Sequence, residues 1–307
     1  MSTPFGELTV IVNPHAGRRH VGEEIPELER TLRARGLPYR LLRTEGRGDA
    51  SRFARDALES GGRFVVAVGG DGTVHEVVNG MFDDEGKPLV PDTVLGVVAA
   101  GSGCDFVRTF GLPQDVPRAV HHLDGDRLYP IDLARVDYTE DGRTVTRYVP
   151  NIAECGLGGA VVRRAERLPR WLGRSRYFWA FWLSVRGYRP GHISVRADRK
   201  SWEGRASNVV IANGQFYGGG MKISPRSYPG DGLLDIQIST GPKSEAFTMI
   251  PKVYRGEHVP HPHIKEMRGK SITVEADRPL PIEGDGEVLG TTPATFTVIP
   301  EVVSLKI

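Results

Sequence analysis

Cysteine and long apolar runs are both scarce in this chain of 307 residues. Its two cysteines, Cys104 and Cys155, have no CxxC or metal-finger spacing, so a disulfide framework is not indicated and a reducing, cytoplasmic location is expected. The densest apolar stretch, residues 177–185, is about half as long as a bilayer-spanning helix. Residues 1–7 lack a basic region followed by an apolar core, so no signal peptide is expected. Any membrane association is therefore expected to be transient and peripheral.

The chain also has no large excess of positive or of negative residues. Lys and Arg total 40 against 38 for Asp and Glu, a net charge of +2, which is too small to indicate a nucleic-acid partner. Apolar residues make up 39% and charged residues 25% of the chain, as in globular proteins. The length is sufficient for two domains of ordinary size.

Two common nucleotide-binding motifs are missing. Gly269-Lys270-Ser271 has the ending of a Walker-A loop, but the earlier glycine that the motif requires is Ile264. Gly-x-Gly sequences begin at Gly101 and Gly156, and neither continues to the third glycine of a dinucleotide fingerprint. A P-loop enzyme or a Rossmann dehydrogenase is therefore not indicated.

A glycine-rich segment at residues 65–80 is the strongest feature that is present. An apolar run, residues 65–68, is typical of a buried parallel strand and leads directly into Gly69, Gly70, Asp71, Gly72 and Thr73. Glycines permit a sharp turn, and the free N–H groups at the start of a following helix form an anion site. Asp71 would repel a polyphosphate there unless a cation lay between them. We therefore expect a nucleotide–magnesium complex at this loop.

The first part of the chain alternates strand-like and helix-like patterns. Strands are predicted at residues 8–12, 39–42, 65–68 and 94–100, and the loop after each is rich in small or polar residues. Helical patterns lie between them, one of them ending at Gly36. This order predicts an open, mostly parallel α/β sheet whose ligands bind at the carboxyl ends of the strands.

After about residue 128 the pattern changes to short β-like segments separated by Gly- and Pro-containing turns. Such a pattern predicts an antiparallel β-sandwich. We therefore expect an α/β domain at residues 1–128 and a β-rich domain at residues 129–307, whose last strand could return to the first domain. The expected strands are residues 148–153, 192–197, 207–212, 233–239, 271–275, 294–299 and 302–307.

Five motifs occur in one order along the chain: Asn13-Pro14-x-x-Gly17, Thr44, Gly69-Gly70-Asp71-Gly72-Thr73-x-x-Glu76, Gly101-Ser102-Gly103-x-Asp105-Phe106 and Asp285-Gly286-Glu287. Together they resemble the diacylglycerol-kinase-like lipid kinases, a family that includes bacterial diacylglycerol kinases and sphingosine kinases. The resemblance spans nearly the whole chain. Ser102, Cys104 and His75 depart from it, because the family usually has Thr, Asn and Asn at these positions.

The resemblance implies roles for particular residues. Asp71, Asp105 and Asp132 would organise a catalytic Mg²⁺, and Asp285 and Glu287 would stand at the position of the general base. Tyr228, Asp231 and Leu233 would form a separate structural Mg²⁺ site. The implied nucleotide-binding residues are Asn13, Pro14, Gly17, Thr44, Gly69, Gly70, Asp71, Gly72, Thr73, Glu76 and Ser102.

The implied activity is ATP-dependent, magnesium-requiring phosphorylation of a lipid hydroxyl. Diacylglycerol is the acceptor we expect first, and its product would be phosphatidic acid. ATP would bind to the first domain and the lipid to the second. Other lipid alcohols (a sphingoid base, phosphatidylglycerol), a soluble acceptor such as NAD, and a catalytically silent regulator that binds nucleotide or lipid all remain alternatives. The oligomeric state is open, a homodimer included.

Two further segments have more than one interpretation. Residues 163–189 combine arginines with aromatic residues, which fits either a packed helix with a basic rim or an interfacial segment that docks on lipid. His258, His261 and His263 suggest a metal cluster. Prolines separate these histidines, however, and no nearby carboxylate or cysteine completes a ligand set, so a surface loop is predicted.

Overall fold

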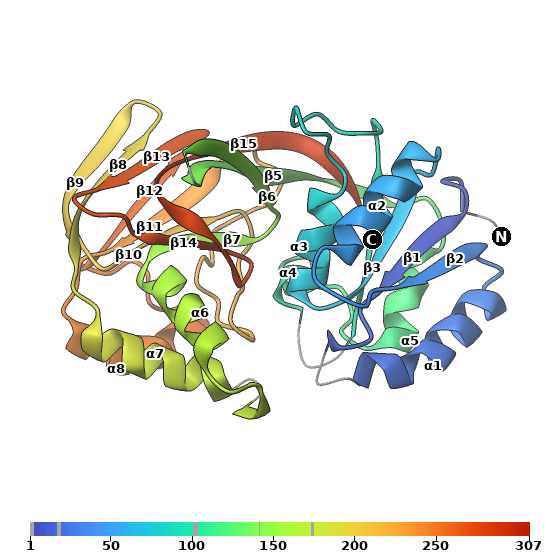
Figure 1. Cartoon of the computed structure of the whole chain (residues 1–307), viewed down its shortest axis with the longest axis horizontal. Coiled ribbons are helices and arrows are strands. Elements are labelled where there is room, and N and C mark those ends of the chain that lie inside the picture. Colours follow the sequence, from blue (N-terminus) through green and yellow to red (C-terminus); the bar gives the residue numbers. More distant parts are fainter. Residues whose placement is uncertain (1–2, 17–19, 101–103, 141, 173–174) are drawn as a thin grey trace. The chain divides into compact units, whose positions relative to one another are not determined.

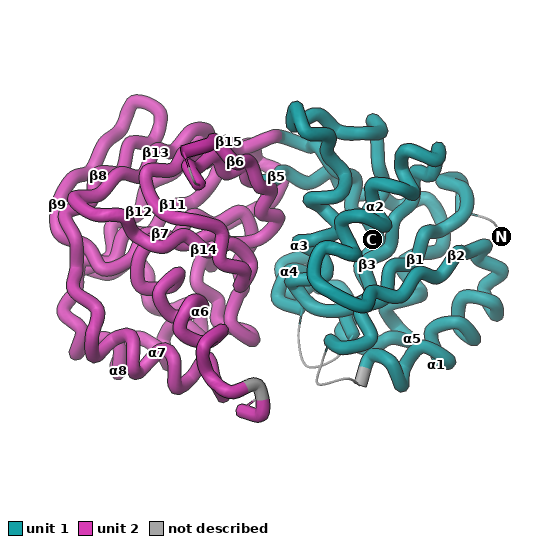
Figure 2. The backbone as a smooth tube through the Cα atoms, in the orientation of Figure 1, with its two compact units in different colours: residues 1–133, 300–307 teal, residues 134–299 magenta. Residues whose placement is uncertain are grey.

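The computed structural model describes residues 3–16, 20–100, 104–140, 142–172 and 175–307. The chain forms two compact units (Figure 2). Unit 1 contains residues 1–133 and 300–307, and unit 2 contains residues 134–299. The end of the chain thus belongs to the same unit as its beginning.

Unit 1 contains a parallel sheet with the strand order β4–β3–β1–β2. Strands β3, β1 and β2 are labelled in Figure 1. The C-terminal part of strand β15 (Glu287–Lys306) adds to its β4 edge, also in parallel, with Ser304 opposite Val94. The bounds are β1 Leu8–Val12, β2 Tyr39–Arg43, β3 Phe64–Gly69 and β4 Val94–Ala99. The predicted open parallel α/β sheet is confirmed.

Helices cover this sheet because parallel strands require crossover connections. Helix α1 places Ile25, Leu28 and Leu32 on one side, and they pack with Leu8 and Val10 of β1 in a single core. Helix α2 contacts α3 and β1, and α3 contacts β3. The bounds are α1 His20–Ala34, α2 Asp49–Glu59, α3 Asp71–Asn79, α4 Asp105–Thr109 and α5 Val116–Ala119.

Unit 2 is built of antiparallel strands in two layers. One layer has the order β12–β11–β10–β7–β14–β15, and the other contains β9, β8, β13 and a later part of β15. Alternate apolar side chains of these strands meet in one core, which includes Val195, Ile236 and Phe296, so the predicted β-sandwich is confirmed. The bounds are β5 Leu128–Glu140, β6 Arg143–Val149, β7 Ile152–Gly156, β8 Gly191–Ala197, β9 Lys200–Ala206, β10 Asn208–Ala212, β11 Leu234–Ser239, β12 Ile264–Gly269, β13 Ser271–Ala276 and β14 Pro281–Gly284.

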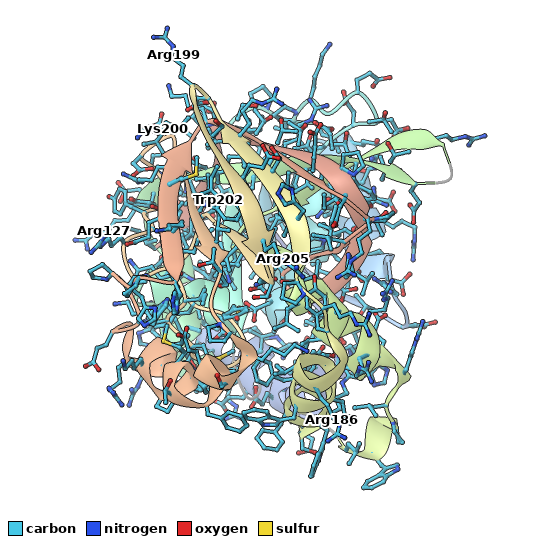
Figure 3. The ribbon with its side chains drawn as sticks, turned by 90° about the vertical axis from the view of Figure 1, so that its left-hand side faces the viewer. Arg127, Arg186, Arg199, Lys200, Trp202 and Arg205 are labelled. Carbon is cyan, nitrogen blue, oxygen red and sulfur yellow. The ribbon has the colours of Figure 1, made fainter. Side chains whose placement is uncertain are left out.

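Some predicted strands were wrong in their limits. The expected strand at residues 148–153 is two strands, because Pro150, which has no N–H to donate, lies between β6 and β7. The expected strands at 294–299 and 302–307 are one strand, β15, which continues through Pro300. Strand β9 was not predicted, since its residues are largely exposed and lack apolar alternation. Arg199, Lys200 and Arg205 mark this charged hairpin in Figure 3, and charge on an edge strand discourages further pairing.

Residues 163–189 do not form one helix. They contain the end of α6 (Leu157–Arg167), a short 3-10 turn (Arg170–Leu172) and α7 (Ser175–Gly187). A third helix of unit 2, α8 (Ala246–Arg255), precedes β12. Among the helices in the described part of the chain, none combines the length and apolarity needed to cross a bilayer.

Candidate functional site

The carboxyl ends of β1, β2 and β3 lead directly into three of the predicted nucleotide-binding motifs. Asn13 and Thr44 follow β1 and β2, and Gly69 is the last residue of β3. Because the strands are parallel neighbours, these ends share one edge of the sheet. The Asn13 Nδ2 atom donates to Thr73 Oγ1 at 3.4 Å, so the first and third motifs are in contact. Pro14 lies half-buried in the same loop as Asn13.

Close packing explains the glycine at position 69. A Cβ atom on Gly69 would lie 2.4 Å from Thr73 Oγ1, so no larger residue fits there. Gly70 is the N-cap of α3, and its carbonyl accepts from the N–H groups of Thr73 and Val74. Helix α3 therefore begins at Asp71, directly after the strand, and its N-terminus faces the loop edge of the sheet.

Asp71 joins the third motif to the fourth. Its carboxylate accepts from the N–H groups of Phe106 at 2.9 Å and Asp105 at 3.1 Å, at the start of α4. The Cys104 thiol also donates to Asp71 at 3.5 Å, and burial raises its pKa, so it remains a neutral donor. Cys104, a departure from the family pattern, thus contributes to holding the two loops together.

The other two predicted magnesium residues are buried in unit 1. Asp105 forms an ion pair with Arg108 at 3.1 Å, and Asp132 accepts from the Glu301 N–H at 2.8 Å. Asp71 and Asp105 are brought together by their hydrogen bond, whereas Asp132 holds the returning end of β15. Carboxylate oxygens are the donors that Mg²⁺ prefers. Asp71 thus offers donors of this type, whereas the Asp105 carboxylate is shared with the Arg108 guanidinium, which a bound ion would have to displace.

The structure gives Glu76 and His75 surroundings that could not be predicted from the sequence. Glu76 accepts from the N–H groups of Gly48 at 3.0 Å and Ala50 at 3.2 Å, so it caps α2 and fixes the segment after Thr44. His75 is buried within α3. A contact of Glu76 with nucleotide stays a prediction, and Gly17 and Ser102 lie outside the described residues.

The Asp285-Gly286-Glu287 motif forms a tight hairpin in unit 2. Asp285 and Gly286 connect β14 to β15 with φ angles of 52° and 84°, as a two-residue loop with both φ positive requires. The Asp285 N–H donates to the Ile152 carbonyl, and Asp285 Oδ1 accepts from the Ile152 N–H at 3.0 Å. The Asp285 carboxylate is therefore held in one place, and Glu287 begins the next strand.

Two buried carboxyl groups support this hairpin. Glu154 of β7 lies directly opposite Glu283 of β14, and each is 3% exposed. Glu283 accepts from the Gly286 N–H at 2.9 Å, and Glu154 accepts from Asn208 Nδ2 at 2.9 Å. Burial raises the pKa of Glu154 to about 7, and burial together with the Glu154 charge raises the pKa of Glu283 well above its usual range. The pair thus retains a proton at neutral pH.

This pair of carboxyl groups was not predicted from the sequence. Its signal was a carboxylate inside an apolar strand, since Glu154 follows Ile152 and Ala153 and precedes Cys155. A charged residue in such a run is seldom buried unless it is paired or protonated.

The pH dependence of stability should report this proton. An unfolded Glu releases its proton near pH 4.3, whereas folded Glu154 keeps it to about pH 7, so the free energy of unfolding falls as pH rises between these values. The contribution is on the order of 3 kcal/mol. We expect Glu154→Gln to reduce this decline in urea unfolding between pH 5 and pH 8, and buried Glu283 to account for the part that remains. The exposed Glu275→Gln is the control, and parallel pH curves for Glu154→Gln and wild type would contradict the assignment.

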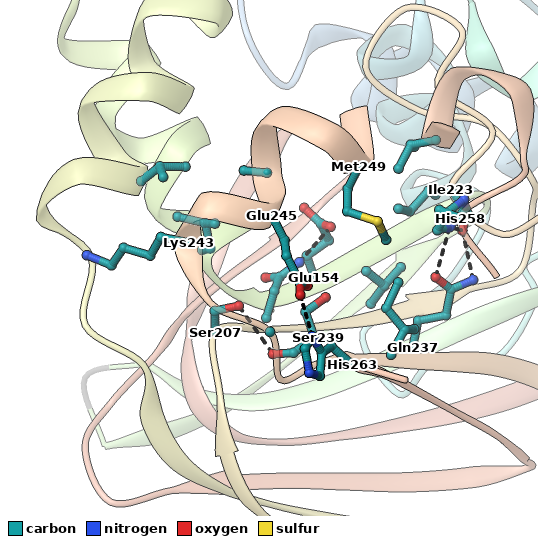
Figure 4. Close-up of a pocket in the computed structure, with 18 of the residues that line it drawn as sticks. Glu154, Ser207, Ile223, Gln237, Ser239, Lys243, Glu245, Met249, His258 and His263 are labelled. Carbon is teal, nitrogen blue, oxygen red and sulfur yellow. Dashed lines mark hydrogen bonds and ion pairs between the residues drawn. The ribbon is translucent and has the colours of Figure 1, made fainter. Parts of the chain in front are cut away.

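Glu154 also lines a cavity within unit 2 of roughly 180 Å³ (Figure 4). Helices α7 and α8 contribute Val185, Met249 and Val253, and most of the wall is apolar. Pockets for whole small molecules usually have about 300–1,000 Å³, so this cavity is smaller than a site for a whole ligand of that kind.

The three residues of the predicted structural metal site lie in one turn. Asp231 accepts from the Leu233 N–H at 3.1 Å, and the Tyr228 carbonyl accepts from the Gly230 N–H at 2.8 Å. The Asp231 carboxylate is paired with the Arg268 guanidinium, which also binds Asp235 at 2.9 Å. A cation at Asp231 would meet this positive charge, so the donor set does not fit a metal in this arrangement, and the metal stays a prediction.

Comparisons with known proteins agree on the family. The family described as "Diacylglycerol kinase catalytic domain" matches residues 7–136, and the one described as "YegS C-terminal NAD kinase beta sandwich-like domain" matches residues 151–307, about half of the chain. The chain is 27% identical to a "Diacylglycerol kinase" of Bacillus subtilis, over 94% of this chain and 91% of that protein. It is 28% identical to a Klebsiella pneumoniae protein named "Probable lipid kinase YegS-like", over 92% of this chain and 91% of that one.

Solved structures show the same fold. A diacylglycerol kinase structure from Bacillus anthracis matches with a TM-score of 0.74 at 22% identity, covering 99% of this chain and 97% of that one. Yeast NADH kinase matches with a TM-score of 0.51 at 11% identity, covering 98% of this chain and 83% of that one. The matching family descriptions, the full-length relatives and the ordered motifs together show that this chain belongs to the diacylglycerol-kinase-like lipid kinases.

Proposed function

We propose that this lipid kinase uses ATP and Mg²⁺ to phosphorylate the hydroxyl group of diacylglycerol. The supporting observation is the Asp71 carboxylate at the start of α3, which is fixed by the N–H groups of Asp105 and Phe106. This arrangement combines a helix N-terminus suited to phosphates with carboxylates suited to a metal. Diacylglycerol is the acceptor named for the Bacillus subtilis relative.

The proposed reaction assigns distinct tasks to the two units. In unit 1, the loop at Gly69–Thr73 and the start of α3 bind and orient the phosphates, and Asp71 and Asp105 would hold Mg²⁺. A bound Mg²⁺ neutralises the charge that develops on the transferred phosphoryl group. In unit 2, Asp285 accepts the proton of the acceptor hydroxyl as its oxygen bonds to the γ-phosphorus and the bond to ADP breaks. The apolar cavity beside Glu154 would take part of an acyl chain.

The test is incubation with labelled ATP, magnesium and single lipids in mixed micelles, with diacylglycerol, a sphingoid base and phosphatidylglycerol in separate reactions. We expect labelled phosphatidic acid from diacylglycerol and no comparable product from the others. Labelled product only from another lipid moves the assignment to that lipid. Phosphorylation of NAD without detergent would favour a soluble acceptor, and a folded protein with no labelled product from any acceptor would overturn the proposal.

We also propose that unit 2 docks on anionic lipid through an aromatic face on and beside α7. Its members are exposed although apolar: Trp171 is 82% exposed, Phe178 58%, Trp179 52% and Leu183 45%. Helix α8 extends this face, because Phe247, 66% exposed, stacks on Trp182 with ring centroids 4.4 Å apart. A helix on the surface of a globular protein normally exposes its polar side. An exposed apolar stripe therefore indicates a surface that binds a membrane or a partner.

Exposed arginines lie on α7 itself and on α6, which contacts α7, and they argue for a lipid surface rather than a neutral partner. Arg163, Arg164, Arg167 and Arg186 are all exposed on α6 and α7, and Arg186 is labelled in Figure 3. Positive side chains beside apolar ones match the headgroup layer of a membrane that carries anionic lipid.

The double variant Phe178→Ser/Trp179→Ser should bind vesicles that contain phosphatidylglycerol roughly tenfold or more weakly than wild type, because burial of two aromatic side chains is lost. Co-sedimentation with vesicles at several lipid concentrations measures this, with Phe53→Ser in unit 1 as the control. Equal vesicle binding by the double variant and wild type would show that another surface docks.

A further inference from the structure

Glu245, His261 and His263 each place one metal-ligating atom within 4.8 Å of the others. Glu245 ends a 3-10 turn (Lys243–Glu245) and directly precedes α8, while the two histidines lie just before β12. The three residues therefore come from two segments, one on each side of α8. From the sequence, no carboxylate was expected to join the two histidines, and the fold brings Glu245 next to them.

His258, the histidine that precedes His261 in the chain, is not part of this cluster. It is buried, and its Nε2 atom lies 2.9 Å from the Ile223 carbonyl and 3.2 Å from Gln237 Oε1. Its position within the core is thus accounted for by hydrogen bonds.

Hydrogen bonds fix the backbone of the cluster at His263. The His263 carbonyl accepts from both the N–H and the hydroxyl of Thr240, at 2.9 and 3.0 Å. The His263 ring contacts the Glu245 carboxylate, and this pair is drawn in Figure 4. His261 lies close by, because its Nδ1 atom accepts from the His263 N–H at 3.2 Å. Small rotations of these partly exposed side chains are enough to change their ligand distances.

The chemistry of the set points to a late divalent metal. Two imidazoles and one carboxylate are a common zinc ligand set, which leaves a fourth position for water. At bond lengths of about 2.0–2.2 Å, tetrahedral ligand atoms lie roughly 3.3 Å apart, so the present spacing needs only a modest contraction. Hard ions such as Mg²⁺ prefer oxygen ligands throughout and do not match two imidazoles.

We propose that Glu245, His261 and His263 bind a Zn²⁺ ion, or a divalent ion of the same class. Glu245 and His263 also line the cavity in unit 2. The bound ion ties the start of α8 to the segment before β12 and fixes this part of the cavity wall. The proposal is independent of the phosphoryl-transfer reaction.

Isothermal titration calorimetry of untagged protein with ZnCl₂ tests the site, since a histidine tag would itself bind zinc. We expect one high-affinity Zn²⁺ per chain, at least about tenfold weaker binding in His261→Ala and in Glu245→Gln, and unchanged binding in His192→Ala, a histidine on β8. Zn²⁺ should also raise the melting temperature of wild type and His192→Ala more than that of the other two variants. Absence of saturable binding, or equal affinity in all four proteins, overturns the proposal.

A spectroscopic readout separates a built site from weak surface binding. Co²⁺ in a site of low coordination number gives intense visible absorption, whereas hydrated or loosely held Co²⁺ does not. We expect this band in wild type and its loss in His261→Ala. A Co²⁺ spectrum that is the same in both proteins would mean that these residues are only an ion pair with a neighbouring histidine.

Discussion

Asp71→Ala should lower the turnover of lipid phosphorylation by roughly 10²-fold or more while both units remain folded. The carboxylate accepts the N–H groups of Asp105 and Phe106, so its loss releases the loop that carries Asp105 as well as one proposed metal ligand. A displacement of about 1 Å in reacting groups is enough for a rate loss of this size. The stability cost should be small, about 0.5–2 kcal/mol, as for the loss of a helix cap.

Asp71→Asn refines this test. Asparagine has almost the same size but presents an NH₂ group to one of the two N–H donors, so we expect a large rate loss here too. Asp56→Ala, an exposed carboxylate on α2, is the matched control and should keep wild-type turnover. Rates are measured with labelled ATP in mixed micelles, and melting curves monitor folding. If Asp71→Ala were folded and fully active, our role for Asp71 would be refuted.

The second large effect is expected for Asp285→Asn. Asparagine retains the oxygen that accepts the Ile152 N–H and tolerates a positive φ, so the hairpin should persist. What is lost is basicity, and general-base assistance is typically worth about 10²–10⁴-fold. We expect kcat to fall within that range while KM for ATP changes little, because the proposed nucleotide residues belong to unit 1.

Glu287→Gln is the matched comparison, because it removes a second carboxylate two residues away without changing its size. Its rate loss should be smaller than that of Asp285→Asn, because Asp285 is fixed at both backbone and side chain by Ile152. The opposite order of rate losses would assign the base to Glu287.

Much of unit 1 could be predicted because its signals are local. A buried parallel strand is an apolar run in the sequence, and the small residues that follow it mark the loop, as at Val65–Gly72. Strand β9 shows the opposite case: it pairs through its backbone while most of its side chains remain exposed, so its residues carry no pattern of burial. Two separate strands were expected at residues 294–299 and 302–307, yet the partners of β15 extend one strand through Pro300.

The sequence was sufficient for the reaction class, because the motifs are short and their chemistry depends on backbone geometry within a few residues. It was not sufficient for the side-chain clusters. Glu154 meets Glu283, Asp231 meets Arg268, and Glu245 meets His263. These partners are separated in the chain and are brought together only by strand pairing and helix packing. Whether a carboxylate stays protonated, forms an ion pair or completes a metal site is therefore a property of the folded chain.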